Sequence, residues 1–210
     1  MDAILVSHKK TVGWLPAESP TLRKEVYAPK ILTGNIRVQN KNFPVLHSSQ
    51  WCWIGKPLDI TNVTFFIVCR FRALDTILLT MRTGNSEIIL AVDVIDGYVR
   101  HLIRGESGNR LAANEINGCR VNTNDTSAFV YGFQYVRKSK DSMQFVACTP
   151  QGILQECSYT NLLFPPSITK IQIGPSDDNL LLHELRVYPY TSLSNQQLID
   201  VHSELRRCWY

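Results

Sequence analysis

The feature that most constrains the fold is a regular succession of short apolar runs between residues 51 and 190. These runs have the length of strands, six to ten residues, and they follow at regular intervals with turns of Gly, Asn, Asp and Pro between them. No run before residue 190 repeats with the period of an amphipathic helix. Strands of this kind bury their apolar faces by packing sheet on sheet, so the pattern predicts an antiparallel sandwich or barrel.

Two runs indicate where the core lies. Residues 63–71 are apolar on both faces in the first half of the run, which predicts a central strand covered on both sides. Residues 127–136 alternate strictly, so their aromatic side chains share one face. These aromatic residues are Phe129, Tyr131, Phe133 and Tyr135. Further strands are predicted at 76–81, 87–95, 98–103, 118–123, 143–148, 153–157 and 183–188, with weak structure over 104–117.

A helix is predicted at the C-terminus. Ser194 and Gln197 have the spacing of a capping box, and Leu193 and Leu198 have that of a hydrophobic staple. The apolar stripe that would lie on the sandwich consists of Leu198, Val201 and Leu205. We expect Trp209 to dock the end of the chain.

The first fifty residues differ from the rest. Four prolines punctuate them, and proline is excluded from the interior of a sheet. We therefore predict an extended N-terminal arm with edge strands over 1–50 and a sandwich domain over 51–210. Such an arm could wrap the sandwich or reach a neighbouring subunit, and wrapping is the simpler interpretation.

Charge and cysteine usage narrow the classes of partner. The net charge of +4 is scattered, which disfavours nucleic acid, and no apolar run reaches the ~20 residues of a membrane span. The apolar run 3–6 is too short for an export signal, so we expect synthesis in the cytoplasm without a signal peptide. The six cysteines form no C-x-x-C pair and are expected to be reduced. Cys148 and Cys157 flank a turn, and a disulfide between them stays open.

The C-terminal region resembles a known family. An Ile-Gly strand end at 171–174, the strand HELRVY at 183–188, the capped helix and the basic-Cys-Trp ending are similar to concanavalin A-like lectin/glucanase (laminin G-like) jelly rolls. The resemblance covers roughly residues 50–210. It implies a two-sheet antiparallel β-sandwich with a C-terminal helix. The superfamily holds lectins, glycosidases, adhesion modules and phage or viral surface proteins, so the resemblance does not choose an activity.

The sequence predicts no catalytic residue and no cofactor. Glucanases of this fold place two carboxylates about 5 Å apart on one strand face. Asp93 and Asp96 are three residues apart and would point to opposite faces, and Glu184 stands alone. Laminin G-like domains often use calcium, and the run Asp177-Asp178-Asn179 could supply oxygen ligands. Acidic loop residues are more often only solvated, so no metal is predicted.

No ligand-binding residue can be assigned. Trp51 and Trp53 would share one strand face, either as a platform for a sugar or protein partner or as core. We expect a non-catalytic structural or surface recognition module of a larger assembly, such as a virion or phage capsid or tail component, located on that assembly. Its partners would be other protein subunits. A glycan-binding lectin is the alternative, and a glycoside hydrolase is the least favoured hypothesis.

Overall fold

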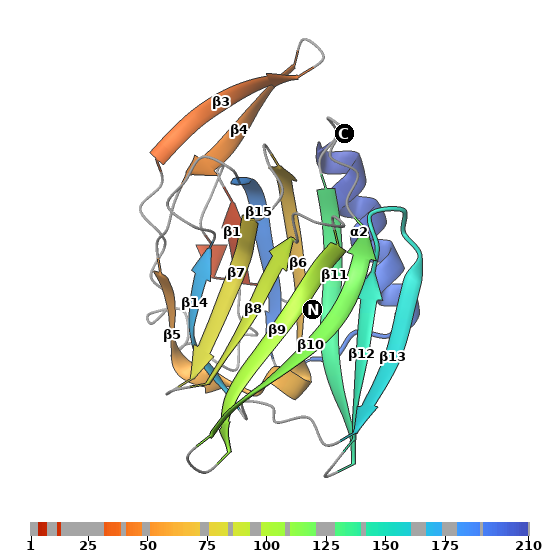
Figure 1. Cartoon of the computed structure of the whole chain (residues 1–210). Helices are drawn as coiled ribbons and strands as arrows, with labels where there is room; N and C mark the ends of the chain where they lie inside the picture. Colours follow the sequence, from red (N-terminus) through yellow and green to blue (C-terminus); the bar gives the residue numbers. More distant parts are fainter. Residues whose placement is uncertain are drawn as a thin grey trace.

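The chain forms two antiparallel sheets that face each other, with a C-terminal helix on the outside of the larger sheet (Figure 1). The computed structural model describes residues 4–7, 12–13, 32–38, 41–47, 51–71, 76–83, 86–92, 98–107, 110–120, 129–139, 142–160, 167–173, 180–189 and 191–209. The predicted two-sheet sandwich with a C-terminal helix is confirmed.

The larger sheet has nine strands, in the order β13-β12-β11-β6-β15-β1-β2, with β4 pairing β15 and β3 pairing β4. Its strands are β1 (Ile4–Ser7), β2 (Val12–Gly13), β3 (Leu32–Val38), β4 (Lys41–His47), β6 (Val63–Phe71), β11 (Phe129–Ser139), β12 (Ser142–Cys148), β13 (Leu154–Thr160) and β15 (Leu180–Pro189). The meander β11-β12-β13 is local in sequence, whereas β15 returns from the end of the chain to lie beside β6.

The smaller sheet has six strands, in the order β10-β9-β8-β7-β14-β5. They are β5 (Trp51–Leu58), β7 (Thr76–Thr83), β8 (Ser86–Val92), β9 (Tyr98–Ser107), β10 (Arg110–Arg120) and β14 (Ile168–Ile173). A short 3-10 turn, η1 (Ile60–Asn62), leads from β5 into β6, and the helix α2 (Asn195–Trp209) ends the described chain. Among the described helices, none is both long and apolar enough to cross a membrane.

Strand β6 lies between β11 and β15, and its residues from Val63 to Cys69 are all fully buried. The prediction of a central strand covered on both sides is confirmed. Phe65 stacks on Phe133, with ring centroids 5.1 Å apart, on the face turned toward the smaller sheet. Phe66 and Val68 lie on the opposite face, under α2. The two faces of one strand therefore serve two separate cores.

The core under α2 is held by the sequence features that predicted the helix. The Ser194 backbone N–H donates to Oε1 of Gln197 at 2.9 Å, and the Gln197 backbone N–H donates to Oγ of Ser194 at 3.3 Å, which confirms the capping box. Leu193 and Leu198 are both buried, as a staple requires. The buried members of this core are Phe66, Val68, Val130, Val146, Cys148, Tyr188, Leu193, Leu198, Leu205 and Trp209.

Gln134 of β11 fixes the entry into α2. Its amide nitrogen donates to the carbonyl oxygen of Leu193 at 2.8 Å, and its amide oxygen accepts from the Leu193 N–H at 2.9 Å. The Thr64 hydroxyl donates to the same amide oxygen at 2.6 Å. Leu193 follows the end of β15, so its backbone N–H and C=O have no strand partner there, and the Gln134 amide bonds both groups instead. The start of α2 is thereby tied to the centre of the sheet.

The prediction of weak structure over 104–117 is wrong. Strands β9 and β10 form a hairpin there, with Ser107 opposite Arg110. The intervening pair Gly108-Asn109 is a two-residue turn signal. Polar residues on either side of this turn hid the alternating pattern that predicts strands. The predicted short strand 118–123 overlaps only the end of β10.

Strands from the first fifty residues join the larger sheet. Ile4 lies opposite Val187 in the β1–β15 pair, and Leu46 of β4 lies opposite Leu182. In Figure 1 the β3–β4 hairpin extends away from the sandwich at the top of the view. The boundary at residue 50 stays a prediction.

The possible disulfide between Cys148 and Cys157 is contradicted by the register of β12 and β13. Cys148 lies opposite Leu154, and Cys157 lies opposite Phe145, so the two thiols are on different faces of the sheet. Cys148 is buried and Cys157 is exposed. Burial raises the pKa of the Cys148 thiol to about 11, which keeps it protonated at neutral pH.

Candidate functional site

A histidine between two tyrosines is the first cluster with the residue types of acid–base chemistry. His101 of β9 points from the smaller sheet into the aromatic face of β11. Its Nδ1 lies 2.5 Å from the hydroxyl oxygen of Tyr135, and its Nε2 lies 2.9 Å from that of Tyr131. Phe145 meets the imidazole edge to face at 4.7 Å.

This cluster is sealed in the core. His101 and Tyr131 have no exposed surface, and Tyr135 is 1% exposed. Burial lowers the pKa of His101 to about 3, and burial raises the pKa of Tyr135 well above its usual value. The imidazole is therefore neutral, with one ring N–H donating to a tyrosine and the other nitrogen accepting from a tyrosine. The arrangement satisfies a polar group inside the sandwich and offers no access to a substrate.

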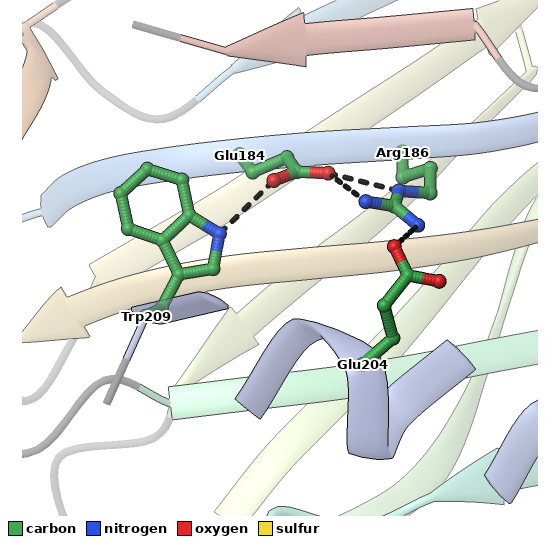
Figure 2. A network of polar contacts seen from close by, with 4 residues as sticks. All are labelled: Glu184, Arg186, Glu204 and Trp209. Atoms are coloured by element: carbon green, nitrogen blue, oxygen red, sulfur yellow. Dashed lines mark hydrogen bonds and ion pairs between the residues drawn. The ribbon is translucent and has the colours of Figure 1, made fainter. Parts of the chain in front are cut away.

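The second cluster joins α2 to β15 (Figure 2). The indole N–H of Trp209 donates to Oε2 of Glu184 at 3.0 Å. Two guanidinium nitrogens of Arg186 lie 2.8 Å from Oε1 of Glu184, and a third donates to Glu204 at 3.0 Å. Burial opposes the charge on Arg186, but the Glu184 carboxylate and hydrogen bonds to Tyr188 and Glu204 raise the pKa of the guanidinium above its ordinary value.

A β-bulge makes this second cluster possible. The pairing of β15 with β6 shifts between Leu182 and Glu184, so His183 is an extra residue. A bulge lets two consecutive side chains face the same side of a sheet. His183 stacks on Trp209 with centroids 5.0 Å apart, while Glu184 binds the indole N–H. The predicted docking of Trp209 is confirmed, and Glu184 has a structural role.

Replacing Trp209 by phenylalanine should lower the free energy of unfolding by about 1–3 kcal/mol, because the buried Glu184 carboxylate loses a donor. Urea unfolding followed by circular dichroism measures the change. The substitution should cost less in a Glu184→Gln background, since the ionised acceptor is already gone. Cys208→Ser, at the exposed neighbour of Trp209, is the matched control and should change stability by less than about 0.5 kcal/mol. Equal costs of Trp209→Phe in both backgrounds would contradict the assigned bond.

For the residues that the sequence analysis named as possible binding or metal-ligating residues, the structure does not describe the side chains. Trp51 and Trp53 lie in β5, as predicted, but the structure describes only the backbone there. The run 177–179 and Asp93 and Asp96 lie outside the described residues. Within the described part of the chain, no group of three or more His, Cys, Asp or Glu side chains could hold a metal ion.

One accessible feature of the described surface is the edge formed by β13. This strand ends the larger sheet, and no described strand pairs with its outer side (Figure 1). Residues 155–158 are exposed on both faces of the strand. Ile153, which immediately precedes β13, is 63% exposed. We call residues 153–160 the β13 edge.

The turn before the β13 edge is well defined. The Gly152 N–H donates to the Thr149 carbonyl at 2.8 Å, and the Thr149 N–H donates to the Ile153 carbonyl at 2.9 Å. Gly152 has a φ of 79°, a conformation that favours glycine. His202 of α2 is buried against this glycine. The backbone hydrogen bonds of this turn therefore hold Ile153 in its exposed position.

Strand β13 lacks the usual protection of an edge. Its seven residues pair with β12 without a register shift, and they include no Pro, Gly, Lys or Arg. Its single charge, on Glu156, accepts hydrogen bonds from Gln144 and Asn195, each at 2.8 Å. By contrast, β5 and β10 pair through register shifts, and β2 has two residues. The sequence predicted this strand but could not show that it ends a sheet.

No protein-family model matches the chain, and no curated protein matches it in sequence. Solved structures do match in fold. The binding domain of botulinum neurotoxin serotype G aligns with a TM-score of 0.56 at 9% identity, over 96% of this chain and 50% of that one. The binding domain of botulinum neurotoxin DC in complex with rat synaptotagmin II aligns with a TM-score of 0.53 at 7% identity, over 96% and 51%.

The fold is the concanavalin A-like jelly roll. A galectin of Caenorhabditis elegans, LEC-6, is also similar, with a TM-score of 0.43 and 12% identity over 79% of this chain and 96% of the galectin. The chain spans about half the length of each toxin binding domain. At sequence identities this low, the structural similarity shows the fold and does not show the activity.

Proposed function

We propose that the chain is a non-catalytic recognition module that binds other protein subunits of a larger assembly, such as the surface of a virion or phage particle. The observation that carries the proposal is the β13 edge. A regular, exposed edge strand presents a row of backbone N–H and C=O groups to an incoming strand. Ile153 adds an exposed apolar contact at one end.

The polar clusters support a binding role over a catalytic one. His101 and Glu184 have side chains that could transfer a proton, but both are buried and hold the fold together through hydrogen bonds and an ion pair. A catalytic acid or base has to reach its substrate directly or through a water molecule. One similar structure is the binding domain of botulinum neurotoxin DC in complex with rat synaptotagmin II, of which this chain covers 51%.

Glycan binding is the second candidate. Trp51 and Trp53 are two residues apart in β5, which ends the smaller sheet, so they lie on the same face of that strand. Indole rings at this spacing could stack on a sugar ring. The same fold includes a galectin among the similar structures.

Density-gradient fractionation of the native source, with the chain detected by antibody, separates the two functions. A recognition module of an assembly should sediment with large particles, and protease should reach it on intact particles. Sedimentation only as the free chain, together with glycan-array binding that Trp51→Ala and Trp53→Ala abolish without changing the circular dichroism spectrum, would favour the lectin instead.

A further inference from the structure

We propose that His202 of α2 is a pH-sensitive switch that keeps the β12–β13 turn closed against the helix at neutral pH and loosens it in mildly acidic solution. This turn, residues 149–153, ends in the exposed Ile153 and leads into β13. The switch would therefore regulate the order of the β13 edge, and in this respect the inference rests on the proposed function. The opening itself is a property of the isolated chain.

The imidazole of His202 is enclosed between the helix, β11 and the turn. The side chain is 2% exposed, and a Cβ on Gly152 would lie 3.5 Å from its Nδ1. Backbone carbonyls of Val130 in β11 and of Thr149 and Pro150 in the turn also face the ring. Its buried Nε2 has no hydrogen-bond partner among the described residues. The neutral ring fits this place, whereas a protonated ring would be a buried cation.

The groups around His202 do not compensate a positive charge. Burial, and after it the charge of Arg206 one helical turn away, lower the pKa of His202, and the three carbonyls oppose this shift only in part. The titratable groups Cys148 and Tyr188 of the same core stay neutral, because burial raises their pKa values. The carboxylates of α2 and β13 are bonded to other side chains: Asp200 to Gln196, Glu204 to Arg186, and Glu156 to Gln144 and Asn195.

The turn is the part that protonation should displace. The helix is anchored at its start by Gln134 and at its end by Trp209. The turn depends on the N–H of Gly152, which donates to the carbonyl of Thr149 at 2.8 Å, and on the N–H of Ile153, which donates to the Thr149 hydroxyl at 3.2 Å. A protonated imidazole has a second N–H donor, and the carbonyls that face it include the one that accepts from Gly152. Protonation therefore weakens the turn.

The direction of the pH dependence follows from the two states. In the open turn the ring reaches water and titrates near pH 6.5, whereas in the closed turn its pKa is lowered. Below pH 6.5 the open state binds the extra proton, so a change from pH 7.5 to pH 5.5 should raise the open population by up to about tenfold. Protection factors from hydrogen exchange of the Gly152 and Ile153 amides, measured by NMR, report this population. Amides of β6 report global unfolding and should be better protected at both pH values.

Three variants test whether His202 is the cause. His202→Phe keeps a ring of similar size that cannot titrate, so the protection of the turn should not change between pH 7.5 and pH 5.5. Arg206→Glu places a carboxylate one helical turn from His202 and should clearly reduce the response, because it favours the protonated ring in the closed state. Arg207→Glu is the matched control. It makes the same change of charge at the next exposed position, which does not face His202, and should keep the response of the parent.

The outcomes separate this proposal from the broader function. Turn amides that are protected as strongly as those of β6, a parent whose turn does not respond to pH, or equal responses of Arg206→Glu and Arg207→Glu would each overturn the switch. The last comparison decides even if His202→Phe does not fold. If the switch fails and the chain still sediments with particles in its native source, the recognition function stands without it. If the turn loosens as predicted but the chain never sediments with particles, the switch stands and the assembly role fails.

Discussion

Replacing Gly132 by alanine should lower the free energy of unfolding by about 3 kcal/mol and the melting temperature by roughly 6–12 °C. Gly132 lies opposite Phe66 in the β11–β6 pair, and the Phe66 ring covers the glycine. A Cβ at this position would lie 2.8 Å from Cδ1 and 2.9 Å from Cζ of Phe66. The ring is fully buried under α2, so it cannot move aside without disturbing that core. Gly132→Val should be more destabilising still.

The partner substitution tests the cause. Phe66→Leu removes the ring atoms that collide with the new Cβ, so Gly132→Ala should cost less in that background. Gly152→Ala is the matched control for the loss of a glycine. Its Cβ would meet His202 at an ordinary 3.5 Å, and its cost should be about 1–2 kcal/mol, from the positive φ alone. Phe66→Leu should leave that cost unchanged. Thermal unfolding followed by circular dichroism measures the stability of each variant. If Gly132→Ala costs as much in the Phe66→Leu background as in the parent, the proposed collision between the Cβ and the Phe66 ring is contradicted.

Features of the fold that depend on local pattern were predictable from the sequence. The capping box at Ser194, the central strand 63–71 and the aromatic face of 127–136 are all encoded within ten residues or so. Each of these patterns records which side chains the segment has to bury. The strand predicted over 98–103 is the first part of β9, but the rest of the β9–β10 hairpin was missed because the run 104–117 is rich in polar residues and Gly, and only the turn signal Gly108-Asn109 marked it.

Features that depend on which strands become neighbours could not be predicted. His101 meets Tyr131 and Tyr135 only because β9 and β11 come to face each other from different sheets. The bulge at His183 appears only in the register between β15 and β6. The β13 edge likewise requires the complete strand order, because a strand's own sequence does not state whether another strand follows it. The binding candidates Trp51 and Trp53 could be placed on a strand but not assigned a role.

Acidification from pH 7.5 to pH 5 should destabilise the protein by about 2 kcal/mol through His101 alone. In the unfolded chain the imidazole titrates near pH 6.5, whereas burial lowers its pKa to about 3 in the folded protein. Between these values the unfolded state binds one more proton, so stability is complete above pH 6.5 and falls as the pH drops toward 3. The imidazole faces the hydroxyls of Tyr131 and Tyr135, and burial raises the pKa of Tyr135 well above its usual value, so that hydroxyl stays neutral throughout this range. His202, whose pKa is also lowered by burial and by Arg206, adds to the loss in the same direction.

Urea unfolding at pH 7.5, 6.5, 5.8 and 5 measures this dependence, in a range above the ordinary titration of carboxylates. His101→Gln should be less stable than the parent at pH 7.5, because it loses a hydrogen bond to at least one tyrosine, but its stability should change less with pH. If that variant does not fold, NMR of the parent decides: the His101 ring resonances should not titrate between pH 7.5 and 5, whereas those of an exposed histidine would. If His101 titrates near pH 6.5, water reaches the space between the two sheets. In that case the claim that His101 is inaccessible to a substrate fails, and so does the support that this claim gives to a binding role.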